Sequence, residues 1–156
     1  MAIAVHRGAS HEASDGIEAA LAESIHGLMR GVLHQLQPTL EHEELTMGRF
    51  WVLHLISSLD APTLTRVSRH LAVSGPATCA VLDGLESSGL ISRRRSERDR
   101  RVVELVLTPS GRRAEAAVWR AIGRALAAAA EGIPSAELRT TAATLTTIAG
   151  RIGGAA

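Results

Sequence analysis

The stretch ISRRRSERDRRVVELVLTPSG, residues 91–111, reads as a β-hairpin in a chain whose apolar residues otherwise repeat at helical intervals. Apolar and polar residues alternate in VVELVLT, as they do in a half-buried strand, and LISRR supplies a partner strand across a charged loop around SERD. Eight of the chain's 17 arginines lie between Arg93 and Arg113. The sequence therefore predicts a hairpin that concentrates positive charge.

Helices are predicted for most of the remaining chain, because apolar residues recur there at spacings of three or four. Thr46 and Ser74 are predicted N-caps, and Pro38 and Gly89 are predicted to end helices. Residues 1–15 lack this periodicity and are predicted to form a flexible N-terminal arm. The predicted helices cover residues 17–37, 47–58, 63–72, 75–88, about 109–130 and 135–152.

Residues 63–108 thus combine two short helices, a tight turn and the hairpin. This order is typical of a winged helix-turn-helix, which places its second helix in the major groove of DNA. The expected fold class is mainly α with a small β-hairpin wing. Formal net charge is only +1, so nucleic-acid binding would depend on local clustering of the arginines.

The composition also limits the cellular setting. A single cysteine, Cys79, excludes an intrachain disulfide and is typical of a reducing compartment. The N-terminal sequence has no apolar core of a signal peptide, and the longest unbroken apolar run, residues 125–130, is too short to span a bilayer. A cytoplasmic protein without membrane contact is expected.

Motifs of common enzyme classes are absent from the sequence: there is no GxSxG, phosphate loop, HExxH or Cys-x-x-Cys. The ionisable residues form no recognisable catalytic spacing. Neither an enzyme nor a cofactor is therefore expected.

Three stretches together resemble the MarR family of bacterial transcriptional regulators. LTMGRFWVLHLI is similar to the family's second helix, and LTRVSRHLAVSGPATCAVLDGLESSGLISR to its helix-turn-helix. DRRVVELVLTPSG fits the family's wing signature, in which Asp-x-Arg precedes a strand and Leu-Thr-x-x-Gly; those residues are Asp99, Arg101, Leu107, Thr108 and Gly111. The resemblance covers roughly residues 17–150.

The resemblance implies a homodimer that grips a pseudo-palindromic operator in double-stranded DNA. Residues 16–150 would form the MarR-like domain after the arm of residues 1–15. Within it, residues 46–108 would form the DNA-binding lobe, and residues 16–45 and 109–152 would form N- and C-terminal dimerisation helices. Long apolar helices at both ends of a small chain are consistent with a symmetric partner.

The resemblance also assigns DNA contacts. Asp99 would orient a neighbouring guanidinium at the tip of the wing, where arginine suits a narrow minor groove. The recognition helix departs from the family at Cys79, Ala80 and Gly84, where relatives carry more polar or basic residues, so weaker direct base reading is expected. The proposed DNA-binding residues are Ser74, Gly75, Ala77 and Thr78 on the recognition helix, Arg66 and Arg69 on the preceding helix, and Arg94, Arg95, Arg98, Arg100 and Arg101 in the wing.

The family's ligand crevice lies between the dimer helices and the winged lobe. A small aromatic or anionic effector would suit it, because it could draw on both basic and aromatic side chains. The same aromatic residues could equally serve only as packing. The candidate ligand-binding residues are His26, Arg30, His34, Trp51, His54 and Trp119.

The leading hypothesis is a ligand-responsive repressor, and three alternatives remain open. A winged-helix protein with lost or altered DNA binding could act as a partner adaptor. Cys79 could make the protein a redox sensor, although the family's peroxide sensors carry their reactive cysteine near the start of the first helix, where this chain has none. Metal sensing would need more histidines than the fifth helix provides, so no metal site is expected.

Overall fold

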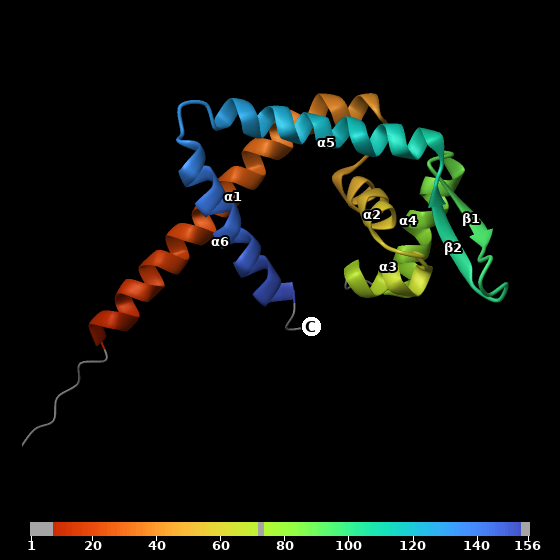
Figure 1. Ribbon diagram of the computed structural model, residues 1–156, viewed down its shortest axis with the longest axis horizontal. Coiled ribbons are helices and arrows are strands. Elements are labelled where there is room, and N and C mark those ends of the chain that lie inside the picture. Colours follow the sequence, from red (N-terminus) through yellow and green to blue (C-terminus); the bar gives the residue numbers. More distant parts are fainter. Residues whose placement is uncertain (1–7, 72–73, 154–156) are drawn as a thin grey trace, which may run out of the picture. The chain divides into compact units, whose positions relative to one another are not determined.

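The computed structural model describes residues 8–71 and 74–153, and the chain forms two compact units, Met1–Ile122 and Gly123–Ala156. The fold is mainly helical with one two-stranded antiparallel hairpin, which confirms the predicted fold class (Figure 1). The elements in chain order are α1 (Gly8–His42), α2 (Met47–Ser58), α3 (Leu64–Leu71), α4 (Gly75–Ser87), β1 (Ile91–Arg95), β2 (Val103–Leu107), α5 (Pro109–Ala129) and α6 (Ser135–Gly153).

The first helix is longer at both ends than the sequence predicted. It begins at Gly8, so it includes the second half of the predicted arm, while residues 1–7 lie outside the described residues. Pro38 does not end it, and this prediction is wrong: the helix continues to His42. Leu36 and Leu40 on either side of the proline are buried, so packing holds this turn despite the missing N–H.

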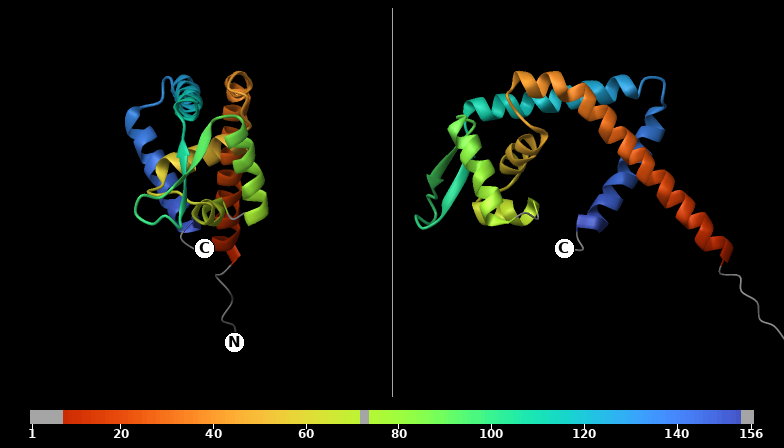
Figure 2. Two further views of the ribbon diagram at one scale, coloured as in Figure 1. Left: turned by 90° about the vertical axis from the view of Figure 1, so that its right-hand side faces the viewer. Right: turned by 180° about the vertical axis from the view of Figure 1, so that it is seen from behind.

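Pro38 accounts for the shape of α1. A proline ring inside a helix clashes with the carbonyl four residues earlier, and helices bend at such points. Figures 1 and 2 show that α1 bends before its C-terminal end. A turn then follows in which the amide of Leu45 donates to the carbonyl of Leu40 (2.8 Å), and α2 begins after Thr46.

The core of the first unit is built from one face of each element. Phe50, Leu53 and Ile56 of α2 are buried, as their spacing predicted. Each fully buried side chain of this size contributes about 1.5–3 kcal/mol relative to an exposed one. The remaining fully or nearly fully buried apolar side chains include Leu36, Leu40, Val67, Leu82, Leu85, Ile91, Leu105, Leu107, Ala114 and Val118.

The hairpin attaches to this core along β2. Its register pairs Ile91 with Leu107 and Arg93 with Leu105, so the buried residues of both strands share one face. The amide of Leu105 also donates to the carbonyl of Pro62 (2.8 Å), which ties β2 to the α2–α3 connection. Figure 2 shows the hairpin projecting beyond the group of α2, α3 and α4.

Two glycines allow the chain to enter and leave the hairpin. Gly89 has φ +68°, a left-handed conformation that ends α4, as predicted. Gly111 in the first turn of α5 packs so closely that a Cβ there would overlap the carbonyl oxygen of Leu90. Thr108 caps α5, because its Oγ1 accepts from the amide of Gly111 (3.1 Å).

The second unit consists of the end of α5, a turn through Gly132 (φ +81°) and α6. None of the residues of α6 is buried, although Leu138 and Ile152 are large and apolar. Within residues 8–71 and 74–153, no helix combines the length and apolar character needed to cross a membrane.

Candidate nucleic-acid interface

The helix-turn-helix of the first unit consists of α3 and α4. Ser74 takes the N-cap position of α4 with extended backbone (φ −61°, ψ 149°), and Pro76 lies in the first turn, as the sequence predicted. The Ser74 side chain makes no capping hydrogen bond. Ser74, Gly75 and Ala77 are exposed, so the N-terminal half of α4 offers its surface to a partner.

Thr78 does not belong to this exposed surface. Its side chain is buried, with 1% relative exposure, and its Oγ1 donates to the carbonyl of Ser74 (3.1 Å). The prediction that Thr78 contacts DNA is therefore wrong. Helical spacing explains the error, because Thr78 shares the inward face with Leu82 and Leu85. Cys79, the next residue, is half-buried.

The two arginines of α3 differ in their surroundings. The guanidinium of Arg66 donates to the carbonyls of Asp60 and Ala61, so it holds the loop before α3. Arg69 is exposed in the last turn of the helix. The side chain of Arg69 is therefore exposed to solvent, whereas the guanidinium of Arg66 is engaged in hydrogen bonds within the protein.

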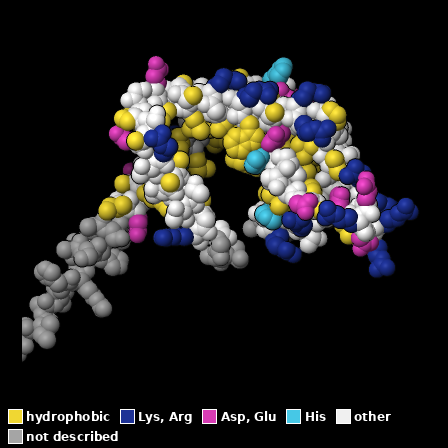
Figure 3. Space-filling view, in the orientation of Figure 1, with side chains coloured by type: hydrophobic (Ala, Val, Ile, Leu, Met, Phe, Trp, Pro, Cys, Tyr) yellow, Lys and Arg dark blue, Asp and Glu magenta, His cyan; other side chains and the backbone are white. Residues whose placement is uncertain are grey.

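The hairpin and its tip, residues 91–107, form the wing. Figure 3 shows arginine side chains gathered over this part of the first unit. Arg98, Arg100 and Arg101 are exposed at the tip. The tip is closed by backbone bonds, because the amide of Ser96 donates to the carbonyl of Val102 and the amide of Val102 to that of Asp99 (both 2.9 Å).

Asp99 shapes the tip in a way that the sequence did not predict. Its Oδ1 accepts a hydrogen bond from the backbone amide of Arg101 (3.0 Å), and no guanidinium among the described residues lies within ion-pair distance of it. The expectation that Asp99 orients a neighbouring guanidinium is therefore corrected. Aspartate favours turns through such side-chain bonds to amides two residues ahead, so Asp99 fixes the backbone from which Arg101 projects.

Arg94 and Arg95 lie on the strand before the tip. Arg95 Nη1 donates to the carbonyl of Arg100 (3.0 Å), which braces the tip from the side. Arg94 pairs in register with Glu104, and both line an open hollow of about 340 Å³ beside the α2–α3 connection. The exposed guanidinium of Arg94 is therefore on the flank of the wing and not at its end.

Two further arginines, Arg49 and Arg93, bind α4 from neighbouring elements, and the sequence predicted neither role. Arg49 of α2 donates through Nη2 to the carbonyl of Gly84 (2.9 Å) and to Ser88 Oγ (2.7 Å). Arg93 of β1 binds Asp83 and Glu86 of α4. The alternation of β1 indicates that Arg93 shares a face of the strand with the buried Ile91. The sequence does not indicate that α4 packs against this face.

The candidate ligand-binding residues separate into two groups. Trp51, His54 and Trp119 come together with Phe50 in one aromatic cluster that holds every Phe and Trp of the chain. The two indoles are 6.2 Å apart and nearly perpendicular, and they are 44% and 38% exposed. The other group, His26, Arg30 and His34, is exposed along α1 and makes none of these contacts.

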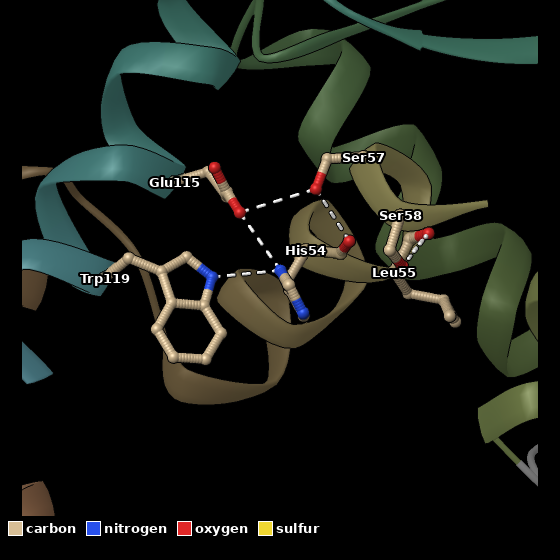
Figure 4. A network of polar contacts seen from close by, with 6 residues as sticks. All are labelled: His54, Leu55, Ser57, Ser58, Glu115 and Trp119. Atoms are coloured by element: carbon tan, nitrogen blue, oxygen red, sulfur yellow. Dashed lines mark hydrogen bonds and ion pairs between the residues drawn. The ribbon is translucent and has the colours of Figure 1, made fainter.

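A polar network runs through the aromatic cluster (Figure 4). The indole N–H of Trp119 donates to Nδ1 of His54 (2.9 Å), and Oε1 of Glu115 lies 3.0 Å from the same nitrogen. A neutral ring with a lone pair on Nδ1 accepts from Trp119, whereas a proton on Nδ1 is donated to Glu115. One nitrogen thus serves one partner at a time. Glu115 was not anticipated from the sequence.

Across the part of the chain that the structure describes, no group of three or more His, Cys, Asp or Glu side chains is placed to hold a metal ion.

Comparison with known proteins agrees with this architecture. The sequence model of the MarR family matches residues 45–103. The HTH-type transcriptional repressor MdtR of Bacillus subtilis (strain 168) is 23% identical over 100 residues, 64% of each chain, so the match spans just under two thirds of that relative.

Two solved structures share the fold over almost the whole chain. The transcriptional repressor CouR, bound to a 23-mer DNA duplex, is 28% identical with a TM-score of 0.69, covering 94% of this chain and 99% of that one. A Staphylococcus aureus MarR protein in complex with salicylate and kanamycin is 23% identical with a TM-score of 0.77, covering 90% and 95%. The wing, the helix-turn-helix and these likenesses agree: over residues 45–103 the chain is similar to the MarR family, and its fold resembles that of solved MarR-family proteins.

Proposed function

We propose that this protein is a sequence-specific DNA-binding transcriptional regulator that acts as a repressor. The observation that carries the proposal is the placement, in one compact unit, of an exposed helix start beside an arginine-bearing hairpin tip. A helix of this kind fits the major groove, and arginines at a wing tip fit the minor groove. The similarity to CouR, which is bound to a DNA duplex, supports the same role.

The assignment of contacts follows from exposure. Ser74, Gly75 and Ala77 face the bases, with the Ala77 methyl suited to a thymine methyl group. Arg101 and its neighbours Arg98 and Arg100 enter or border the minor groove. Arg69, Arg94 and Arg95 contact phosphates, which adds affinity without sequence preference. Because α4 offers few polar donors, the wing and the shape of the DNA carry much of the specificity.

The regulator acts as a homodimer on a pseudo-palindromic operator. Residues 16–45 and 109–152 form the dimerisation helices, and residues 46–108 form the DNA-binding lobe. Two facts support this assignment: α1 leaves large apolar side chains such as Ile17, Leu28 and Met29 exposed, and α6 buries none of its residues. A symmetric partner would remove this apolar surface from water.

Selection from a random-sequence duplex library, followed by sequencing, tests the proposed function. We expect the protein to enrich two inverted half-sites whose centres lie about 10 base pairs, or a multiple of that, apart. Recovery of a library without any enriched sequence would contradict sequence-specific binding and would favour a partner adaptor.

The same regulator responds to a small aromatic effector at the aromatic cluster. The two partly exposed indoles offer faces for an aromatic ring, and their perpendicular arrangement suits edge and face contacts. His26, Arg30 and His34 of α1 make none of the ring contacts of this cluster, so the proposal rests on the aromatic part of the effector. The coupling needed is modest, about 1–3 kcal/mol.

Salicylate is a suitable probe, because a solved relative holds it. Both tryptophans of the chain lie in the cluster, so binding there should quench their fluorescence. We expect salicylate to quench the fluorescence and to weaken operator binding over the same concentration range. Quenching without any change in operator affinity would show that the cluster binds a ligand but does not regulate.

A further inference from the structure

Arg93 connects the wing to the recognition helix. Its Nη2 lies 2.6 Å from Oδ1 of Asp83, and its Nη1 lies 2.5 Å from Oε2 of Glu86. Its backbone amide also donates to Oε1 of Glu86 (3.2 Å). One residue of β1 thereby makes three bonds to two carboxylates on α4, and each bond joins elements that are proposed to enter different grooves of the DNA.

The local geometry explains why the guanidinium stays in place. Arg93 pairs with the buried Leu105 in the hairpin register, so its side chain leaves the strand on the face that packs toward α4. Asp83 and Glu86 are three residues apart, which puts them on one face of the helix. The fork of a guanidinium can serve two carboxylates at once, and its planar shape limits how the two elements can rotate.

The charge on Arg93 is secure. Its hydrogen bond with Asp83 is the main cause that raises the pKa of the guanidinium above its ordinary value, with a further contribution from Glu86. The two carboxylates remain partly exposed, at 63% and 39% of their side chains, so the stabilisation from each ion pair alone is small. The main effect of the two ion pairs is therefore to restrict the orientation of β1 relative to α4, and their contribution to stability is secondary.

Asp83 and Glu86 are otherwise difficult to reconcile with DNA binding. They place two negative charges on the helix that is proposed to approach a polyanion. A helix selected only for affinity would carry neutral or basic residues at these positions. Their pairing with Arg93 gives them a role that offsets this electrostatic cost.

We propose that Arg93 is a positioning residue, which through Asp83 and Glu86 fixes the angle between the wing and the recognition helix and so sets the spacing at which the two read DNA. Arg93 itself does not contact DNA. This inference rests on the proposed DNA-binding function. It assigns specificity to residues that join the wing to α4, and it separates Arg93 from the tip arginines, which contribute affinity directly.

The sharpest test removes the carboxylates and not the arginine. The double variant Asp83→Asn/Glu86→Gln loses two negative charges near the DNA, so simple electrostatics predicts tighter binding to every duplex. The positioning role predicts a different pattern: affinity for a mixed-sequence duplex rises, while the preference for the duplex selected by the wild-type protein falls by about three- to tenfold. Fluorescence anisotropy with both duplexes measures the ratio of the affinity for the selected duplex to the affinity for the mixed-sequence duplex.

A matched control is available in the same unit. Asp60 and Glu97 are exposed, and neither side-chain carboxylate has a hydrogen-bond or ion-pair partner among the described residues. The variant Asp60→Asn/Glu97→Gln changes the net charge by the same amount. We expect it to strengthen binding to both duplexes equally and to leave their ratio unchanged. A ratio that is also unchanged in Asp83→Asn/Glu86→Gln would overturn the positioning role.

A distance measurement decides the inference without DNA. Spin labels at Ala80→Cys on α4 and Val102→Cys near the wing tip, in a Cys79→Ser background diluted with unlabelled protein, report the spread of distances between the two elements. We expect a broader distribution in Asp83→Asn/Glu86→Gln than in the control variant. Identical distributions would overturn the inference, whereas failure of the wild-type protein to select any duplex would overturn the proposed function alone.

Discussion

At the scale of single residues, the structure separates arginines that hold the fold from arginines that remain available to a partner. The guanidinium groups of Arg49, Arg66 and Arg93 bind carbonyls or carboxylates of neighbouring elements. Arg98 and Arg101 stay exposed at the wing tip, on a backbone that side chains and amides hold in shape. The sequence showed the clustering of arginine, but neighbours distant in sequence decide which arginines are engaged.

Asp99 provides a test in which electrostatics and structure predict opposite signs. Asp99→Ala removes a negative charge from a surface proposed to meet DNA, yet it also removes the acceptor that holds the amide of Arg101. We expect weaker operator binding, by about 0.5–1.5 kcal/mol, the typical contribution of one such hydrogen bond. Glu97→Ala makes the same charge change nearby without a recorded side-chain bond and should strengthen binding slightly. Tighter binding by both variants would show that Asp99 does not shape the tip.

Gly111 provides a test of the junction between the wing and α5. Gly111→Ala places a methyl group against the carbonyl of Leu90, where backbone cannot move aside easily. We expect the free energy of unfolding to fall by about 1–3 kcal/mol, as for overpacked sites. Gly123→Ala is the control, since beyond its chain neighbours and the adjacent backbone of α5 nothing lies within 4 Å of its added Cβ, and it should be neutral or stabilising. Urea denaturation that gives the two variants equal stability would contradict the close approach.

At the scale of elements, the sequence predicted the number, type and order of helices and strands, because apolar periodicity and cap residues act locally. It failed at Pro38, where burial of Leu36 and Leu40 keeps a helix that local preference would end. It also failed for Thr78, which was assigned to the outer face of α4 from its place near the helix start. Both errors come from packing partners that no local pattern specifies.

The helix caps give an element-scale prediction with a built-in comparison. Thr46 Oγ1 accepts from the amide of Arg49 (3.2 Å), whereas Ser74 occupies a cap position without a side-chain bond. Thr46→Ala should therefore lower the free energy of unfolding by about 1 kcal/mol, and Ser74→Ala should change it little. Thermal unfolding of the two variants measures the difference. Equal losses would show that Ser74 caps α4 in solution.

At the scale of the whole molecule, the proposed function requires assembly. The wing and α4 form one proposed DNA-binding surface per chain, and the proposed palindromic operator would need two. Exposed apolar residues on α1 and the unburied α6 give a physical reason for a partner, although the sequence could indicate only the apolar stripes and not which residues stay exposed. The sequence likewise predicted residues of the aromatic cluster but not Glu115. That residue lies 61 positions after His54 and reaches it only through the packing of α5.

Sedimentation equilibrium tests the assembly. We expect a dimer at micromolar concentration, because a monomer would leave the apolar side chains of α1 and α6 in water. Leu28→Glu puts a charge on the exposed apolar stripe of α1 and should shift the equilibrium toward monomer, whereas Gln35→Glu on the same helix should not. A wild-type protein that stays folded as a monomer at this concentration would exclude the proposed dimer.

The salt dependence of DNA binding tests the central claim that the wing tip meets DNA. The variant Arg98→Gln/Arg100→Gln/Arg101→Gln removes three exposed charges, and Arg113→Gln/Arg120→Gln/Arg124→Gln removes three from α5 as a control. An arginine held in or beside the minor groove neutralises phosphate charge as a direct phosphate contact does, and each such charge that is lost lowers the slope of log affinity against log salt by roughly 0.9. The proposed dimer loses six tip charges in the wing variant, so we predict a slope about 5 units smaller and an almost unchanged slope for the control. Equal slopes for the two variants would contradict the account, because bulk charge and not the wing would then determine binding.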